Sequence, residues 1–286
     1  MKFGVVMFVT DYSMGVRDLA LAVEERGFES LFLPEHSHIP TDRTSPWPGG
    51  PELPRHYLHS LDPFIGLAAA ATVTEKLLIG TGVCLVVQRD PIDTAKQVST
   101  LDMLSNGRFL FGIGGGWNRE EMANHGTDAS KRFAIMRERV LAMKEIWAND
   151  EAEFHGKYVD FDPIWQWPKP RQHPHPPILV GGDGPSVLKR AVEYGDGWFP
   201  LHGRSKEPIA ERIKDLNDMA AAAGRDPLPV TLFSGPAQHQ IVEEHMQAGV
   251  DRYVFSLPSS GAEQVIPLLD RLSEMIESFD GAVATP

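Results

Sequence analysis

The chain has a single cysteine, Cys84, among its 286 residues, so no disulfide can form within it. Basic side chains are also scarce, because 27 Lys and Arg stand against 39 Asp and Glu and give a formal net charge of −12. A surface of that sign repels nucleic acid and anionic membranes. We therefore expect neither as a partner, and an anionic ligand would have to be held by local groups.

Long apolar runs are missing as well. The stretch 3–9 is too short to span a bilayer, and no small-residue cleavage signal follows it. It is predicted to be the first strand. With 42% hydrophobic and 23% charged residues, the chain is expected to bury a full core as a cytoplasmic protein.

Strand-like and helix-like segments alternate along the chain. Strands are predicted at 3–8, 30–34, 77–85, from 108, and at 178–181, 198–201, 230–233 and 252–257. Helices are predicted at 14–27, 61–72, 90–107, 133–147, 185–194, 206–223, 238–248 and 262–279. Eight such units predict a single α/β domain that spans residues 1–286 and folds as a closed parallel (β/α)8 TIM barrel.

Two segments interrupt this alternation. The Pro- and Gly-rich loop 36–60 follows the second strand, at the barrel end that carries the chemistry, and is predicted to act as a lid. The insertion 151–177 comes before the fifth strand, at the opposite end. Its alternating pattern predicts a small hairpin turning at His155-Gly156, with a structural role.

Glycines gather where two of the predicted strands end. Gly114-Gly115-Gly116 precedes Trp117, and Gly181-Gly182-Asp183-Gly184-Pro185-Ser186 precedes a helix. Free amides and the helix dipole at the second cluster predict an anion site, although Asp183 would repel a phosphate if it pointed inward. The alternative is an ordinary turn in which Asp183 caps the helix.

Several motifs, taken together and in this order, resemble the bacterial luciferase-like superfamily. They are Pro34-Glu35-His36, Gly80-Thr81-Gly82-Val83, Arg89-Asp90-Pro91, Gly112-Ile113-Gly114-Gly115-Gly116-Trp117, Pro177 with Gly181-Gly182, and Asp196-Gly197-Trp198. Within that superfamily the chain most resembles the probable coenzyme F420-dependent oxidoreductases. The resemblance covers the first two-thirds of the chain. Beyond about Leu201, only the alternation of predicted strands and helices matches.

The resemblance implies a deazaflavin coenzyme that exchanges a hydride with a small organic substrate. It places a bulge with a non-prolyl cis peptide at about Gly82-Val83 against the coenzyme ring, whereas a packing glycine is the simpler interpretation. It also implies coenzyme contacts at Gly114, Gly115, Gly116 and Trp117, and a phosphate at Gly181, Gly182, Asp183 and Gly184.

His36 is the expected catalytic residue, because the resemblance puts a histidine there beside the reactive carbon, where it can exchange a proton. Glu35 would bind substrate or set the tautomer of that histidine. His38 is expected to be structural. We predict no metal, since a third ligand for a His36-x-His38 pair is not evident.

Trp117 is expected either to cover the substrate or to anchor its loop. It stands where some sugar-phosphate-specific relatives carry a glutamate, and Lys189, Arg204 and Arg252 form no convincing phosphate trio. A sugar-phosphate substrate is therefore in doubt, and the substrate itself is not predicted.

Three other functions stay open. They are an FMN-dependent monooxygenase of the same superfamily using O2, a hydrolase using Glu35 and Glu120 as paired carboxylates, and a non-catalytic flavin- or deazaflavin-binding protein. A homodimer is also expected, since luciferase-like barrels often pair.

Overall fold

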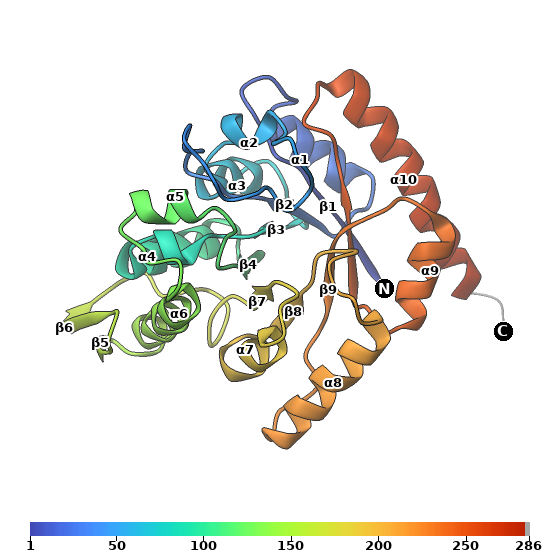
Figure 1. Cartoon of the computed structure of the whole chain (residues 1–286). Helices are drawn as coiled ribbons and strands as arrows, with labels where there is room; N and C mark the ends of the chain where they lie inside the picture. The colour runs from blue at the N-terminus through green and yellow to red at the C-terminus, as the bar shows by residue number, and fades with distance from the viewer. Residues whose placement is uncertain (284–286) are drawn as a thin grey trace.

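The structure, a computed structural model, describes residues 1–283 and has the predicted barrel (Figure 1). Its strands are β1 (Lys2–Val6), β2 (Ser30–Leu33), β3 (Leu78–Thr81), β4 (Phe109–Ile113), β7 (Ile178–Gly181), β8 (Gly197–Phe199), β9 (Thr231–Gly235) and β10 (Arg252–Ser256). They pair in parallel in the order β8-β7-β4-β3-β2-β1-β10-β9. Parallel bridges from Trp198 to Val230 and from Leu201 to Phe233 join the two ends, so the sheet closes on itself.

Helices surround this sheet (Figure 1). They are α1 (Val16–Glu25), α2 (His56–His59), α3 (Pro63–Ala71), α4 (Pro91–Leu104), α5 (Arg119–Asn124), α6 (Arg132–Ala148), α7 (Val187–Tyr194), α8 (Ile209–Ala222), α9 (His239–Gln247) and α10 (Ala262–Val283), with a 3-10 turn at Val86–Gln88. Asp62 and Asp90 cap α3 and α4, and a proline follows each cap, so the start of both helices is encoded locally.

The core has two parts, as a barrel requires. A small cluster inside the sheet is made of Val6, Phe32, Leu110, Leu179, Phe199 and Val254. A much larger cluster lies between the sheet and the helices, where Met136, Val140 and Met143 of α6 are buried. Phe133 is an exception to the predicted buried face of α6, because it is 39% exposed and lines a cavity at the carboxyl ends of the strands.

The insertion forms the predicted hairpin, with β5 (Glu151–His155) antiparallel to β6 (Asp160–Trp165). His155 pairs with Asp160, so the turn lies at 156–159, one residue later than expected. None of the hairpin side chains lines the cavity that opens at the carboxyl ends of the barrel strands, and its structural role stays a prediction. The helix predicted from Pro185 starts two residues later, at Val187, which leaves Gly182–Ser186 as a loop.

Candidate active site

A cavity of about 1110 Å³ opens at the carboxyl ends of the strands, as the fold predicts. Its lining brings together all the site residues predicted from the sequence. These are Glu35, His36, Gly82, Val83, Gly114, Gly115, Gly116, Trp117, Gly181, Gly182, Asp183 and Gly184. The lid-like loop contributes Trp47, Pro48 and Tyr57.

His36 is held from both sides by hydrogen bonds. It follows β2 and its side chain is only 5% exposed. Its Nδ1 lies 2.7 Å from Oε2 of the fully buried Glu121, and Trp117 Nε1 donates to its Nε2 at 3.3 Å. Because the indole N–H can only donate, Nε2 is the acceptor and the proton sits on Nδ1. The lone pair of Nε2 is therefore occupied by the Trp117 N–H in this structure.

Glu121 is itself fixed in place by the start of α5. Asn118 caps that helix and accepts the backbone N–H of Glu121, while Glu121 Oε1 accepts the backbone N–H of Ser37 at 3.0 Å. A carboxylate behind a histidine orients the ring and stabilises an imidazolium when one forms. Sequence analysis did not assign this role, since Glu121 lies 85 residues from His36 and no local motif joins them.

Glu35 does not set the tautomer of His36, which corrects one of its two predicted roles. Its carboxylate instead accepts the backbone N–H of Leu85 at 2.6 Å and the Arg89 Nε–H at 2.5 Å. Arg89 also binds Asp62 at 2.7 Å. Glu35 thus joins the end of β2 to the turn after β3.

The carboxylates proposed for a hydrolase do not form a pair. Glu120 accepts hydrogen bonds from Thr44 and Ser45 of the lid-like loop, and it is not part of the pocket lining. Glu35 is bound to Leu85 and Arg89. Each group therefore holds a loop in place, and neither faces the other across the cavity.

The predicted cis peptide between Gly82 and Val83 is confirmed, directly after β3. A Cβ at Gly82 would lie 2.7 Å from a ring carbon of Phe233 and 3.1 Å from Cβ of Phe32. Packing alone therefore requires a glycine at position 82, in line with the simpler interpretation of a packing glycine. Gly82 and Val83 also line the pocket, and their contact with a coenzyme ring stays a prediction.

The loop after β7 presents free amides at one end of the pocket. Among residues 1–283, the backbone N–H groups of Asp183, Gly184 and Ser186 have no hydrogen-bond acceptor. Trp198 Nε1 holds the carbonyl of Gly182 from behind at 2.9 Å. Gly182 has φ +121°, a conformation that only glycine adopts readily. Together with the start of α7, these amides form a site suited to an anion.

Asp183 does not cap α7, whose first turn has no side-chain cap. Its Oδ2 instead accepts the backbone N–H of Leu201 at 3.2 Å. Burial raises the pKa of this carboxyl above its ordinary value. The sequence suggested that the Asp183 carboxylate would repel a bound phosphate. That repulsion is smaller than expected, because the carboxylate is bound to Leu201 and ionises less readily.

Two arginines beside this loop were missed by sequence analysis. Arg132 and Arg190 line the pocket and lie against the ring of Phe133, at 4.5 and 4.0 Å from its centroid. Arg190 also donates to Ser186 Oγ at 2.7 Å. The buried Nε of each has no partner among the described residues. No motif marks them, since one starts α6 and the other lies inside α7.

Aromatic rings form the wall around His36. Tyr57 and Trp117 lie 5.2 and 5.5 Å from it between ring centroids, and Trp47 lies 5.8 Å from Tyr57. Trp117 therefore packs as part of the pocket. His38 is outside the lining and binds Ser37 and Asn124, as expected for a structural residue. Among residues 1–283, no three His, Cys, Asp or Glu side chains are grouped to hold a metal.

Lys189, Arg204 and Arg252 do not all lie at one site. Arg252 binds Glu29 at the opposite end of the barrel, with contacts of 2.5 and 2.7 Å. Arg204 lines the pocket and donates to the carbonyl of Pro48 in the lid-like loop, and Lys189 lines a separate cavity. Within the described part of the chain, no helix is long and apolar enough to cross a membrane.

Sequence comparison matches residues 1–265 to the family model described as luciferase-like monooxygenase. An uncharacterized protein of Mycobacterium tuberculosis is 38% identical, over 96% of this chain and 98% of that protein. An F420-dependent hydroxymycolic acid dehydrogenase of the same organism is 28% identical, over 73% of this chain and 54% of that protein. An FMNH2-dependent dimethylsulfone monooxygenase of Pseudomonas putida is 32% identical, over 54% and 43% respectively.

Solved structures with the same fold include both kinds of enzyme. A monooxygenase from Streptomyces bottropensis has a TM-score of 0.81 at 20% identity, covering 98% of this chain and 99% of its own. An F420-dependent secondary alcohol dehydrogenase has a TM-score of 0.76 at 19% identity, covering 97% and 99%. At these identities the likeness concerns the fold and leaves the coenzyme open.

Proposed function

Because this chain belongs to the luciferase-like monooxygenase family, we propose that it is an oxidoreductase that transfers a hydride between the deazaflavin coenzyme F420 and a small organic substrate. The observation that carries the proposal is the arrangement of one cavity, with free amides at one end and an acceptor nitrogen of His36 at the other. The F420-dependent relative supports this choice of coenzyme.

The residues present fit a large, flat, anionic coenzyme. The amides of Asp183, Gly184 and Ser186, together with Arg132 and Arg190, would hold its phosphate. Gly82, Val83 and Gly114–Gly116 would lie against the ring system. When bound, the deazaflavin supplies the two-electron hydride chemistry.

The role of the protein in the reaction is to move a proton. Once a substrate hydroxyl replaces the Trp117 N–H at His36 Nε2, this nitrogen takes the hydroxyl proton as the carbon that bears the hydroxyl is oxidised. It returns a proton in the reverse direction. Glu121 stabilises the imidazolium that forms, through the bond to Nδ1. The wall of Trp47, Tyr57 and Trp117 limits the access of water, which strengthens these interactions.

The test is a side-by-side titration of the purified protein with F420 and with FMN. We expect F420 to bind in the micromolar range or tighter, and FMN at least about tenfold more weakly, a difference of about 1.4 kcal/mol. Equal or reversed affinities would favour the second candidate, an FMN-dependent monooxygenase, which the Pseudomonas relative supports. Binding of F420 without turnover of any substrate would favour a coenzyme-binding protein.

A further inference from the structure

Ser234 and Ser256 place two hydroxyl groups side by side at the barrel mouth. Their Oγ atoms lie 2.5 Å apart, and both residues line the main pocket. Val254 of β10 belongs to the cluster inside the sheet, and side chains two residues apart on a strand point to the same side. Ser256 therefore continues the inner face of β10 at the end of the strand where the pocket opens.

Ser234 reaches the same place through an irregularity in β9. Phe233 and Ser234 together lie opposite a single residue of β10, which makes a β-bulge, and both line the pocket. Bulges beside active sites re-aim side chains in this way. Ser234 has φ +62°, a left-handed conformation that is unfavourable for residues other than glycine. Because glycine would adopt this backbone without strain, a serine here indicates that its hydroxyl is used.

The two hydroxyls can serve a ligand as both donor and acceptor. Each hydroxyl carries one proton and two lone pairs, and the bond between Ser234 and Ser256 uses only one proton and one lone pair. The remaining proton suits a carbonyl oxygen, and the remaining lone pairs suit a hydroxyl. Neutral hydroxyls do not compensate a full negative charge, so the pair is suited to an uncharged group.

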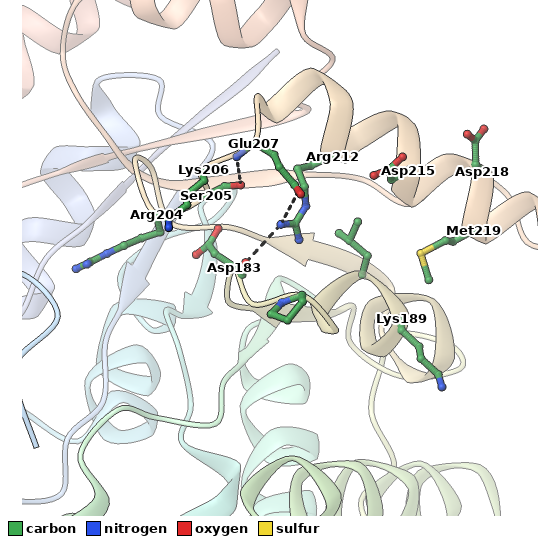
Figure 2. A pocket seen from close by; sticks show the side chains of 12 residues that line it. Asp183, Lys189, Arg204, Ser205, Lys206, Glu207, Arg212, Asp215, Asp218 and Met219 are labelled. Atoms are coloured by element: carbon green, nitrogen blue, oxygen red, sulfur yellow. Dashed lines mark hydrogen bonds and ion pairs between the residues drawn. The ribbon is translucent and has the colours of Figure 1, made fainter.

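The charges around the pocket agree with an uncharged ligand at this pair. The charged side chains that line the pocket all contact groups other than the two serines: Glu35, Arg55, Arg132, Asp183, Arg190 and Arg204. The separate cavity beside α8 adds no net charge from its side, because equal numbers of basic and acidic side chains line it (Figure 2).

We propose that the Ser234–Ser256 pair binds a second, uncharged oxygen of the substrate. The substrate is then a neutral alcohol or ketone that carries a further hydroxyl or carbonyl group away from the reacting carbon. Only β1 separates β10 from β2, which His36 follows, so the two strand ends lie roughly 10 Å apart. A small carbon skeleton with an oxygen at each end spans this distance. The inference rests on the proposed function, because the reacting oxygen must lie at His36.

The experiment compares three probes that share one ring: trans-1,4-cyclohexanediol, cyclohexanol and trans-4-hydroxycyclohexanecarboxylate. Their dissociation constants for the F420-loaded protein are measured by calorimetric titration. We expect the diol to bind about tenfold more tightly than cyclohexanol, as one additional hydrogen bond provides. The carboxylate should bind no more tightly than cyclohexanol. Equal binding of diol and cyclohexanol, undetectable binding of the diol, or preference for the carboxylate would overturn the subsite.

Ser256→Ala should reduce the preference for the diol to about one and leave F420 affinity unchanged. Ser259→Ala is the matched control, because Ser259 lines the same pocket but is not part of the pair. It should keep the tenfold preference. An equal loss in both variants would overturn the assignment to the pair. A comparable loss of F420 affinity in Ser256→Ala would also overturn it, since the pair would then hold the coenzyme.

Ser234→Gly separates a role in binding from a role in folding. It should also remove the preference for the diol, while the thermal midpoint of unfolding stays the same or rises, because glycine adopts φ +62° without strain. A clearly lower midpoint would show that the hydroxyl is needed for the bulge and would overturn the subsite. Failure of the wild-type protein to bind F420 would instead overturn the proposed function, and the same probes would then be compared on the protein without coenzyme.

Discussion

The two ends of the main pocket are built from different parts of the chain. At the end proposed to bind the phosphate, the unpaired backbone amides belong to one short loop before α7. At the end proposed for proton transfer, side chains of two distant loops meet, because His36 and Tyr57 lie in the loop after β2 and Trp117 follows β4. The first end depends on backbone conformation, so it is sensitive to glycine replacement. The second depends on side-chain identity, so it is sensitive to the loss of single functional groups.

The largest effect is expected at the proton-transfer end. His36→Ala should reduce turnover by about 10²–10⁴-fold with little change in coenzyme affinity, because a general acid–base group acts in the transition state. Turnover and coenzyme binding would be measured with the first substrate found. His38→Ala is the control, since His38 lies outside the pocket. Equal losses in both variants, or loss of coenzyme binding in His36→Ala, would remove His36 from catalysis.

A change at the anion end should instead weaken coenzyme binding. Gly184→Glu places a carboxylate beside the free amides and should lower coenzyme affinity by about 2 kcal/mol, or roughly 30-fold. This position tests charge without strain, because a Cβ at Gly184 meets nothing within 4 Å, whereas Gly182 has φ +121°. Gly184→Gln is the matched control and should bind at near wild-type affinity. Unchanged affinity in a folded Gly184→Glu protein would place the phosphate elsewhere.

The difference between a site built from one loop and a site built from distant segments also explains what the sequence could predict. The barrel and the anion loop follow from local patterns, such as alternating strand and helix segments and the glycines of 181–184. The Glu121–His36 pair and the arginines beside Phe133 arise only when distant segments are folded together. Glu35 illustrates the limit, because both it and His36 line the pocket, yet the Glu35 carboxylate binds Arg89 and Leu85 and makes no bond to His36. Adjacency in sequence therefore did not indicate a shared role.

Glu121→Gln should separate orientation from charge at the proton-transfer end. Glutamine can still accept the Nδ1–H of His36, but the loss of a charge-assisted bond of about 1.5 kcal/mol should slow turnover about tenfold. Unchanged turnover in a folded Glu121→Gln protein would show that Glu121 only holds the loop.

The smallest effect concerns the attachment of the lid-like loop. Hydrogen bonds from Ser45 and Thr44 lower the pKa of Glu120 to about 2. A carboxyl with a depressed pKa in the folded state stabilises that state above its unfolded pKa, and the contribution is lost as the pH falls from about 4.5 toward 2. Because the group is at the surface, we expect at most about 1 kcal/mol. Glu120→Gln should therefore reduce stability slightly at neutral pH and flatten its acid dependence. Urea unfolding at pH 7 and pH 3 would measure both, and identical pH dependence in the two proteins would show that the contact does not contribute.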